Sequence, residues 1–385
     1  MIKQEINELK RLYTPSNCSI TRICGCYVDG EKNKKTEFKE AFLSLPEEEI
    51  FKYFELLRKT LSGSLGKNLL NLDFPLASEQ EGGTQAALLA LRDSKLKDDA
   101  LIEEFYDRVI NTYEYVGNYL ILLIHDAYDV PGKTTDGLTM DDASDTVFEY
   151  IMCCICPVNL SKPGLSYDNI NNEFHNRIRD WVVEMPETGF LFPSFNDRAT
   201  DIHSTLFYSK NPEEAHSEFV ENILGCTMPL SAGTQKEAFQ ALIEETLGDE
   251  VEYEVVKNIH ENLTEMIEEH KEIPEPLTLD KNQVKSLFEK SGVKEEKLTD
   301  FDKLYDAAAG EDTSLFVNNV ANVRTFEVKT PDVVVKVNPE RADLVNTLQI
   351  DGKRCLVIEI NDHVEVNGIT IHQSVSLEDV ADEEE

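Results

Sequence analysis

The stretch "GNYLILLIHDAYDVPG", residues 117–132, decides how this chain of 385 residues is organised. Its centre, 119–124, is an unbroken apolar run, which is typical of a strand buried on both faces. A second run, "TVFEYIMCCICPVNLS" at 146–161, has the same character and follows a polar loop. The two runs therefore predict an antiparallel pair of strands in the middle of a sheet.

Helical patterns surround this central pair. Apolar residues recur at helical spacing, and we expect helices over 2–13, 46–63, 84–115 and 254–271. Asn211 followed by Pro212 predicts a further helix start, because asparagine caps and proline suits the first helical position. The stretch 64–83 between two of these helices is expected to be a loop.

The pattern changes after residue 315. Apolar and polar residues alternate with period two, and Asp351-Gly352 and Asn367-Gly368 are hairpin signals. The sequence therefore predicts an α+β fold, with a mostly antiparallel central sheet flanked by helices and a smaller C-terminal domain with a β-meander. The expected boundaries are a main domain at 1–271, a linker at 272–283, the C-terminal domain at 284–375 and a disordered acidic tail at 376–385.

The charge balance limits the classes of partner. The chain has 37 basic and 74 acidic residues, a net charge of −37. Such a field repels nucleic acid and anionic lipid at long range, so direct nucleic-acid binding is disfavoured and no membrane association is expected. The balance favours solubility, and beyond that either a protein partner with a basic surface or mimicry of a nucleic acid. The sequence does not determine the oligomeric state.

The compartment is predicted to be the cytoplasm. We find neither an apolar stretch of about 18 residues nor the apolar core of a signal peptide. The eight cysteines are expected to be thiols. In strands, the pairs in "CGC" (Cys24, Cys26) and "CCIC" (Cys154, Cys156) would each share a face. Core packing is the favoured interpretation, and a zinc site with sulfur ligands is the alternative.

A polar loop interrupts two aromatic, strand-like runs in "GFLFPSFNDRATDIHSTLFYSKN", residues 189–211. This loop, "NDRATD" at 196–201, is called the NDRATD loop below. It offers Asp197, Arg198 and Asp201, and His203 follows it. Carboxylates, a guanidinium and an imidazole could hold a divalent metal with a phosphate or act as an acid–base pair. The favoured alternative is a hairpin turn, because Asn-Asp sequences form turns through their own side chains.

Two other histidines deserve comparison with this loop. His125 and Asp126 follow the first buried run, at a strand end of the kind where site residues are often held, and His125 is the further catalytic candidate. In "NEFHNRIRDW", His175 and Arg179 would share one face of a helix. No phosphate-binding loop, dinucleotide fingerprint or hydrolase motif occurs, so the sequence identifies no cofactor and assigns no metal ligand.

The combination of "FLFPSFNDRATDIHSTLFYSKN" with "DGKRCLVIEINDHVEVNGI" at 351–369 resembles an uncharacterised family of Gram-positive bacterial proteins, known only as a domain of unknown function. The resemblance covers nearly the whole chain and implies a bacterial cytosolic protein without a known activity. The sequence is compatible with two functions. The preferred one is a non-catalytic binding or regulatory module that meets a protein partner through its acidic surface or its C-terminal sheet edge. The alternative is a metal-assisted phosphoester or nucleotide hydrolase that uses Asp197, Asp201, His203 and His125.

Overall fold

The structure is a computed structural model that describes residues 1–133, 139–140, 146–248, 251–322, 324–360, 364–366 and 368–371. Backbone contacts divide the chain into two compact units. Unit 1 consists of Met1–Phe239, Lys271–Thr278 and Ser314–Val320, and unit 2 of Gln240–His270, Leu279–Thr313 and the described residues from Ala321 on. The predicted acidic tail at 376–385 lies outside the described residues.

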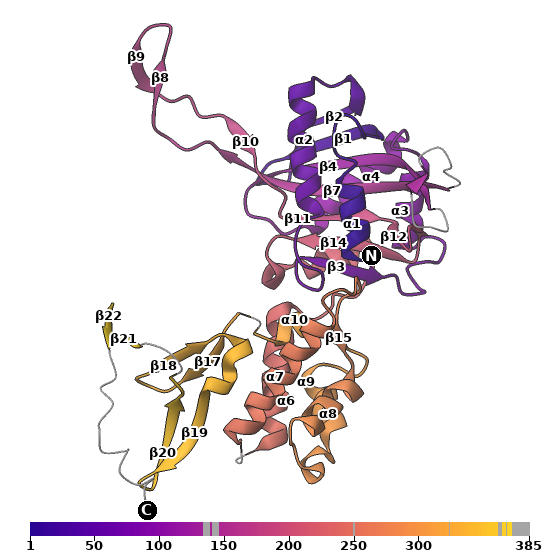
Figure 1. Ribbon diagram of the computed structural model, residues 1–385. Coiled ribbons are helices and arrows are strands. Elements are labelled where there is room, and N and C mark those ends of the chain that lie inside the picture. The colour runs from indigo at the N-terminus through magenta and orange to yellow at the C-terminus, as the bar shows by residue number, and fades with distance from the viewer. Residues whose placement is uncertain are drawn as a thin grey trace, which may run out of the picture. The chain divides into compact units, whose positions relative to one another are not determined.

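Unit 1 is built on one antiparallel sheet (Figure 1). Within the described residues the sheet has eight strands, in the order β2-β1-β4-β7-β11-β14-β3, and β10 pairs with β7 off this path. Their bounds are Ile20–Val28 for β1, Lys34–Ala41 for β2, Leu69–Asp73 for β3, Asn118–Val130 for β4, Thr146–Leu160 for β7, Trp181–Val183 for β10, Thr188–Phe192 for β11 and Ser204–Ser209 for β14.

The predicted central pair is confirmed. β4 and β7 pair antiparallel along their whole lengths, from Asn118 opposite Val158 to Val130 opposite Thr146. Other strands flank the pair on both sides, so its backbone hydrogen bonds are satisfied inside the sheet. The unbroken apolar runs occur because both faces of these strands are covered.

Helices cover the sheet on its two faces (Figure 1). The core on one face combines Leu122, Ile124 and Cys154 with side chains of α1 and α2. The core on the other face combines Leu123 and Cys153 with side chains of α3 and α4. The helices of unit 1 are α1 (Lys3–Lys10), α2 (Glu47–Thr60), α3 (Thr84–Asp93), α4 (Asp99–Thr112), α5 (Ser217–Phe219), η1 (Phe42–Ser44), η2 (Pro212–Glu214), the π-helix η3 (Val220–Leu224) and α10 (Val317–Val320), and α6 (Ala232–Leu247) begins there.

Two local expectations need correction. The stretch 64–83, expected to be a loop, contains β3, which pairs with β14 and forms one edge of the sheet. The helix predicted from Asn211 starts as expected, since the Asn211 side chain accepts a hydrogen bond from the amide of Glu213. It then breaks at His216, whose φ of 51° is left-handed, before α5 and η3 continue to Gly225.

The short strands of unit 1 form small two-stranded pairs. One of them, β8 (Leu165–Asp168) with β9 (Glu173–Asn176), contradicts the helix considered for His175 and Arg179. A turn follows because Asp168 accepts hydrogen bonds from the amides of Ile170 and Asn171. The other pairs are β5 (Gly132–Lys133) with β6 (Thr139–Met140), β12 (Ser194–Asn196) with β13 (Ala199–Asp201), and β15 (Thr278–Leu279) with β16 (Leu315–Phe316).

Unit 2 combines helices with C-terminal hairpins, so the predicted α+β class holds for it as well. Its strands pair two by two: β17 (Phe326–Lys329) with β18 (Val334–Val337), β19 (Val345–Ile350) with β20 (Lys353–Ile358), and β21 (Val364–Val366) with β22 (Ile369–Ile371). Its helices are α7 (Tyr253–Glu269), α8 (Lys281–Lys290), α9 (Phe301–Ala308), η4 (Glu295–Leu298) and η5 (Pro339–Leu344). No helix of the described chain has the length and apolar character that a membrane span needs.

Candidate functional site

The NDRATD loop is a tight β-hairpin. Asn196 in β12 pairs with Ala199 in β13, which leaves Asp197 and Arg198 as the two turn residues. Their φ angles are 52° and 56°. Two successive left-handed residues are the signature of the type I′ turn, whose twist matches that of the flanking strands. The hairpin interpretation of this loop is therefore confirmed.

Arg198 is anchored inside unit 1. Its Nη2 donates to Oε1 of Glu8 at 2.8 Å and to the carbonyl of Pro131 at 3.1 Å, and its backbone amide donates to Oε1 of Glu5 at 3.3 Å. The side chain is 19% exposed. The hydrogen bond to Glu8 raises the pKa of Arg198 above its usual range. The guanidinium thus connects the hairpin to α1 and to the end of β4.

Asp201 is held by three donors. Its Oδ2 accepts from Nδ2 of Asn196 at 2.6 Å and from Oγ of Ser204 at 2.8 Å, and its Oδ1 accepts from the amide of His203 at 3.0 Å. Burial acts to raise the pKa of this carboxyl, but the hydrogen bonds from Ser204, Asn196 and His203 outweigh it and lower the pKa. Asp201 therefore stabilises the hairpin, whereas the side chain of Asp197 is exposed.

His203 lies at the surface beside a carboxylate. Its imidazole is 67% exposed, and Nδ1 lies 2.6 Å from Oε1 of Glu79. The hydrogen bond and the charge of Glu79 raise the pKa of His203. The imidazole is thus oriented by a residue of the segment that precedes α3, and not by the carboxylate of Asp197.

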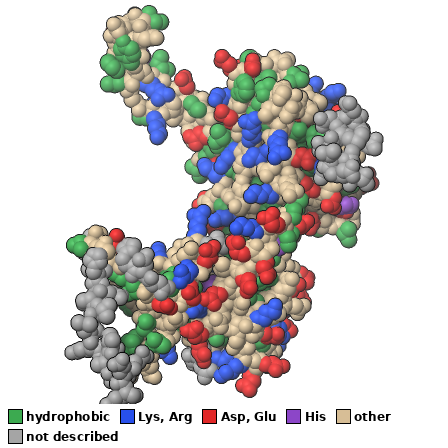
Figure 2. All heavy atoms as spheres, in the orientation of Figure 1, with side chains coloured by type: hydrophobic (Ala, Val, Ile, Leu, Met, Phe, Trp, Pro, Cys, Tyr) green, Lys and Arg blue, Asp and Glu red, His purple; other side chains and the backbone are tan. Residues whose placement is uncertain are grey.

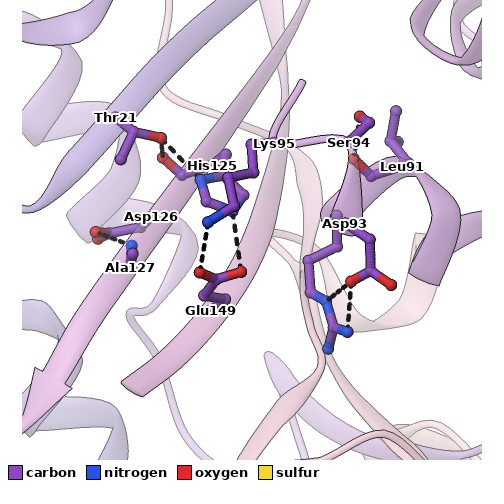
Figure 3. Close-up of polar contacts among 10 residues, drawn as sticks. Thr21, Leu91, Asp93, Ser94, Lys95, His125, Asp126, Ala127 and Glu149 are labelled. Atoms are coloured by element: carbon purple, nitrogen blue, oxygen red, sulfur yellow. Dashed lines mark hydrogen bonds and ion pairs between the residues drawn. The ribbon is translucent and has the colours of Figure 1, made fainter. Parts of the chain in front are cut away.

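His125 has a different environment (Figure 3). Its ring is fully buried, with Nδ1 2.8 Å from Oγ1 of Thr21 and Nε2 4.0 Å from Oε2 of Glu149. Glu149 also accepts a hydrogen bond from Nζ of Lys95 at 2.8 Å. Burial lowers the pKa of His125 to about 4, although the charge of Glu149 acts in the opposite direction. The imidazole is therefore neutral near pH 7.

The sheet separates His125 from the NDRATD loop. Successive residues of a strand face opposite sides, and β4 pairs with β7 without a bulge along its length. His125 therefore points toward the face covered by α3 and α4. Tyr128, on the opposite face, donates its hydroxyl to Glu8, the partner of Arg198, at 2.8 Å. Asp197, Arg198, Asp201 and His203 lie in or next to the same hairpin, and within the described residues no hydrogen bond joins His125 to any of them.

A groove lies where Arg198 meets α1. It has a volume of about 810 Å³ and is lined by Arg198, Tyr128, Asp129 and one face of α1. Sequence reasoning missed the α1 contribution of Gln4, Asn7, Glu8 and Arg11. Their spacing of three and four residues was the signal available, because it places polar side chains on one face of a helix.

The cysteine pairs do not meet. Cys24 and Cys26 belong to the core on the α3 and α4 side, whereas Cys154 and Cys156 belong to the core on the α1 and α2 side. Their strands, β1 and β7, are also separated by β4. Burial raises the pKa of Cys24 to about 11 and that of Cys154 to about 12, which favours the thiol. Among the described residues, no three His, Cys, Asp or Glu side chains form a group that could hold a metal ion.

A projecting segment is the second feature that sequence reasoning missed. Residues 161–185, called the arm, leave the end of β7, form the β8–β9 hairpin and return through β10 (Figure 1). Trp181, the only tryptophan, is 55% exposed, and Phe174 and Ile178 are 70% and 79% exposed. The signal available was a high density of large apolar residues, several of them at helical spacing although the segment forms strands: Leu165, Tyr167, Ile170, Phe174, Ile178, Trp181, Val182, Val183 and Met185.

A comparison with protein-family models matches residues 1–369 to a domain of unknown function, DUF4317. The chain belongs to the DUF4317 family. The resemblance to an uncharacterised family is thereby confirmed, while the Gram-positive origin stays a prediction. No curated protein matches the chain.

The chemistry available to this DUF4317 domain follows from these contacts. The NDRATD loop places one exposed carboxylate, that of Asp197, beside a guanidinium that is already paired with Glu8. Asp201 is engaged by donors of its own hairpin. The arm presents exposed apolar side chains, and polar side chains line the groove along α1.

Proposed function

We propose that the protein is a non-catalytic binding module of the cytoplasm that recognises a partner protein through its arm, residues 161–185. The observation that carries the proposal is the exposure of nine large apolar side chains within this one segment. The free thiol state of all eight cysteines, each of which the structure describes, supports a reducing compartment.

The composition of the arm supports a protein partner. Contiguous apolar surface on a globular protein marks an interaction site, and tryptophan and other aromatic residues supply much of the binding energy at protein interfaces. Here Trp181, Phe174 and Tyr167 provide the aromatic groups. Burying a phenylalanine side chain of this kind contributes about 1.5–3 kcal/mol. A two-stranded hairpin alone is at best marginally stable, so a partner would also stabilise the arm.

Charge complementarity favours a partner with a positive net charge. The chain carries −37, whereas the arm has three Lys or Arg and four Asp or Glu residues and is nearly neutral. A basic partner would be steered to the acidic surface and would then dock on the apolar arm. A second copy of the chain would be repelled by the same field, so we favour a different protein.

The C-terminal sheet edge predicted as a contact surface remains a proposal. In the β19–β20 hairpin, the side chains of Leu348, Ile350 and Ile358 are about half exposed. Within the described residues this hairpin has no third strand, so both of its edges can accept an added strand. It would provide a second contact of the same kind as the arm.

The hydrolase alternative receives less support from the geometry. His125 faces the other side of the sheet from the NDRATD loop, and Asp201 is engaged by three donors. A thermal-shift screen of divalent metals and nucleotides on the wild type and Asp197→Ala tests this alternative. A stabilisation that disappears in the variant would revive the hydrolase, since a ligand at 100 times its Kd adds about 2.7 kcal/mol to the free energy of unfolding.

The experiment for the arm uses Trp181 as an internal probe. A photo-crosslinking residue at Phe174 identifies the protein that contacts the arm in cells. The purified pair is then titrated while the fluorescence of Trp181 is followed. We expect a blue shift, an affinity that falls with salt, and loss of binding in Phe174→Ser.

The matched control is Leu76→Ser, because Leu76 is also a strongly exposed apolar side chain but lies outside the arm. This variant should bind as the wild type does. Equal loss in both variants, or binding without any change in the Trp181 emission, would overturn the proposal. A blue shift that depends only on the concentration of the protein itself would show self-association and would also count against a different partner.

A further inference from the structure

A basic hollow lies between α1 and the end of α2. It has a volume of about 590 Å³ and is lined by Asn7, Lys10, Arg11, Thr14, Asn17 and Arg58. The lining therefore holds three bases and no acid, in a chain whose acids outnumber its bases by 74 to 37. Figure 2 shows Lys and Arg side chains gathered over this part of unit 1.

Two of the bases are held in place by neighbouring groups. Arg58 donates from Nη2 to the carbonyl of Tyr13, and its guanidinium carbon lies 5.9 Å from the centroid of the Phe54 ring. Lys10 donates from Nζ to Oγ of Ser62 at 2.8 Å. Side chains fixed in this way lose less conformational entropy when a ligand binds.

The positive charge of the hollow is not neutralised by the residues that line it. No ion pair with an acid is formed by Lys10, Arg11 or Arg58 within the described part of the chain. Burial, and then the charges of Arg58 and Lys59, lower the pKa of Lys10. Concentrating like charges without a counter-ion is unfavourable unless an anion binds there.

The hollow is continuous with the groove that contains Arg198. Asn7, Arg11 and Asn17 line both. The acids of the groove are Glu8, which already binds Arg198 and Tyr128, and Asp129. The joined site is thus strongly basic at the α2 end and of mixed polarity at the Tyr128 end.

We propose that this site binds a small phosphomonoester, with the phosphate dianion held by Lys10, Arg11 and Arg58 and the organic part lying in the groove toward Tyr128. Guanidinium groups and a lysine amine supply the charge-assisted donors that a phosphate needs. Thr14 and the amides of Asn7 and Asn17 add neutral donors. The site goes beyond the binding of a protein by the arm, because none of its lining residues belongs to the arm.

Calorimetric titration of the full chain tests this site at an ionic strength of about 0.15 M. The probes are inorganic phosphate, phenyl phosphate, and vesicles of phosphatidylcholine with and without phosphatidic acid. We expect phenyl phosphate to bind more tightly than inorganic phosphate, with a Kd below about 1 mM. Binding of the vesicles alone, dependent on phosphatidic acid and on Arg11, would identify a lipid headgroup as the source of the same phosphomonoester.

The test variant is Arg11→Gln, since Arg11 is exposed and its loss should not affect folding. Removing a charge-assisted hydrogen bond should weaken phenyl phosphate binding about tenfold or more. The control is Lys52→Gln on α2, which removes the same charge from a lysine that pairs with Glu55 outside the hollow. This control should bind within about twofold of the wild type. Absence of binding by every probe, or an equal effect of both substitutions, would overturn the proposal.

Discussion

Arg198 and Glu8 lie 190 positions apart in the sequence, yet Nη2 of Arg198 lies 2.8 Å from Oε1 of Glu8. Nε of Arg198 also donates to Oε2 of Glu8 at 3.1 Å, so the guanidinium and the carboxylate form a bidentate ion pair. Both side chains are mostly buried, with 19% and 26% exposed. The pair joins the first helix of the chain to a hairpin near its middle, which gives the NDRATD loop a structural role.

Removing the bidentate ion pair between Arg198 and Glu8 should destabilise unit 1. We expect Arg198→Ala to lower the free energy of unfolding by about 1–3 kcal/mol, because Glu8 keeps its partly buried charge without its partner. The double variant Arg198→Ala with Glu8→Gln should recover part of this loss, because the partly buried charge that has lost its guanidinium partner is gone. Urea unfolding of the wild type, both single variants and the double variant measures the coupling.

A surface ion pair provides the control for this double-mutant cycle. Arg341 pairs with Asp343 at 3.2 Å, but the two side chains are 50% and 60% exposed. Arg341→Ala should change the free energy of unfolding by less than about 0.5 kcal/mol. If Arg198→Ala lowers the free energy of unfolding by no more than this, the ion pair between Arg198 and Glu8 does not hold the hairpin to α1.

His125 should make unit 1 less stable in mild acid. Burial lowers its pKa in the folded state from the ordinary 6.5 to about 4. Between these values the unfolded chain binds a proton that the folded chain does not, so stability falls as the pH drops from 6.5 toward 4 and the effect levels off below that. The loss is up to about 3 kcal/mol. Urea unfolding of the wild type and His125→Gln at pH 7.5 and 4.5 measures it as the difference between the two proteins.

His203 should show the opposite sign. Glu79 raises the pKa of His203 in the folded state. Its stabilising contribution is therefore complete below the unfolded value of about 6.5 and is lost as the pH rises through the folded value. The difference in the free energy of unfolding between the wild type and His203→Gln should shrink with rising pH. The corresponding difference for His125→Gln should grow with rising pH. Parallel pH dependence for both variants would contradict the environments described for these residues.

Gly189 is predicted to be intolerant of a side chain. It lies buried in β11, and a Cβ there would come within 2.4 Å of the carbonyl of Cys153 and 2.8 Å of Cγ2 of Thr60. We expect Gly189→Ala to lower the free energy of unfolding by about 1–3 kcal/mol, because the neighbouring strand and α2 must shift.

Gly164 in the arm is the matched control. A Cβ at this position meets no described atom within 4 Å. Gly164→Ala should leave the native structure intact and add up to about 1 kcal/mol by restricting the unfolded chain. Thermal unfolding measures the stability of both variants. If Gly189→Ala is as stable as the wild type, β11 and β7 are less closely packed than described.

The central strands and the α+β class could be predicted because their signals are local. The apolar runs of β4 and β7 specify burial, and alternation within a strand assigns Leu122 and Leu123 to opposite faces. The NDRATD turn was also recognisable from its Asn-Asp sequence. By contrast, β3 has little local signal. It is a strand because Leu70 and Leu72 find Phe207 and Thr205 opposite, far away in the sequence.

The candidate site was harder to predict for the same reason. His125 was expected at the end of a strand, but β4 continues to Val130, so His125 lies inside the strand, whereas Arg198 lies in a turn. Nothing local in the sequence indicates that the sheet lies between them. Once β4 is aligned with β7, the alternation places His125 on the α3 and α4 side and Tyr128 on the α1 and α2 side. The partner of Arg198 depends on how α1 packs, which no spacing within the NDRATD loop reveals.

The buried chain Tyr13–Tyr150–Asp126 allows one further prediction. The hydroxyl of Tyr150 donates to Oδ2 of Asp126 at 2.7 Å, so its oxygen is left to accept from the hydroxyl of Tyr13 at 3.0 Å. All three side chains are fully buried. Burial raises the pKa of Asp126, and the hydrogen bond from Tyr150 limits this rise.

Tyr150→Phe should therefore be more harmful than Tyr13→Phe. The first removes a donor from a buried carboxyl and should lower the free energy of unfolding by about 1.5–3 kcal/mol, whereas the second breaks one neutral hydrogen bond and should cost about 0.5–1.5 kcal/mol. Without the Tyr150 hydroxyl, the pKa of Asp126 rises further, so the folded variant keeps the Asp126 proton to a higher pH. The loss of unfolding free energy caused by Tyr150→Phe should therefore grow as the pH rises through the pKa of Asp126 in the folded protein. Urea unfolding at pH 5 and pH 8 distinguishes the two, because Tyr13→Phe leaves the Asp126 donor in place and should show a smaller change. Equal penalties with equal pH dependence would mean that Tyr150 is not the residue that stabilises the Asp126 carboxylate.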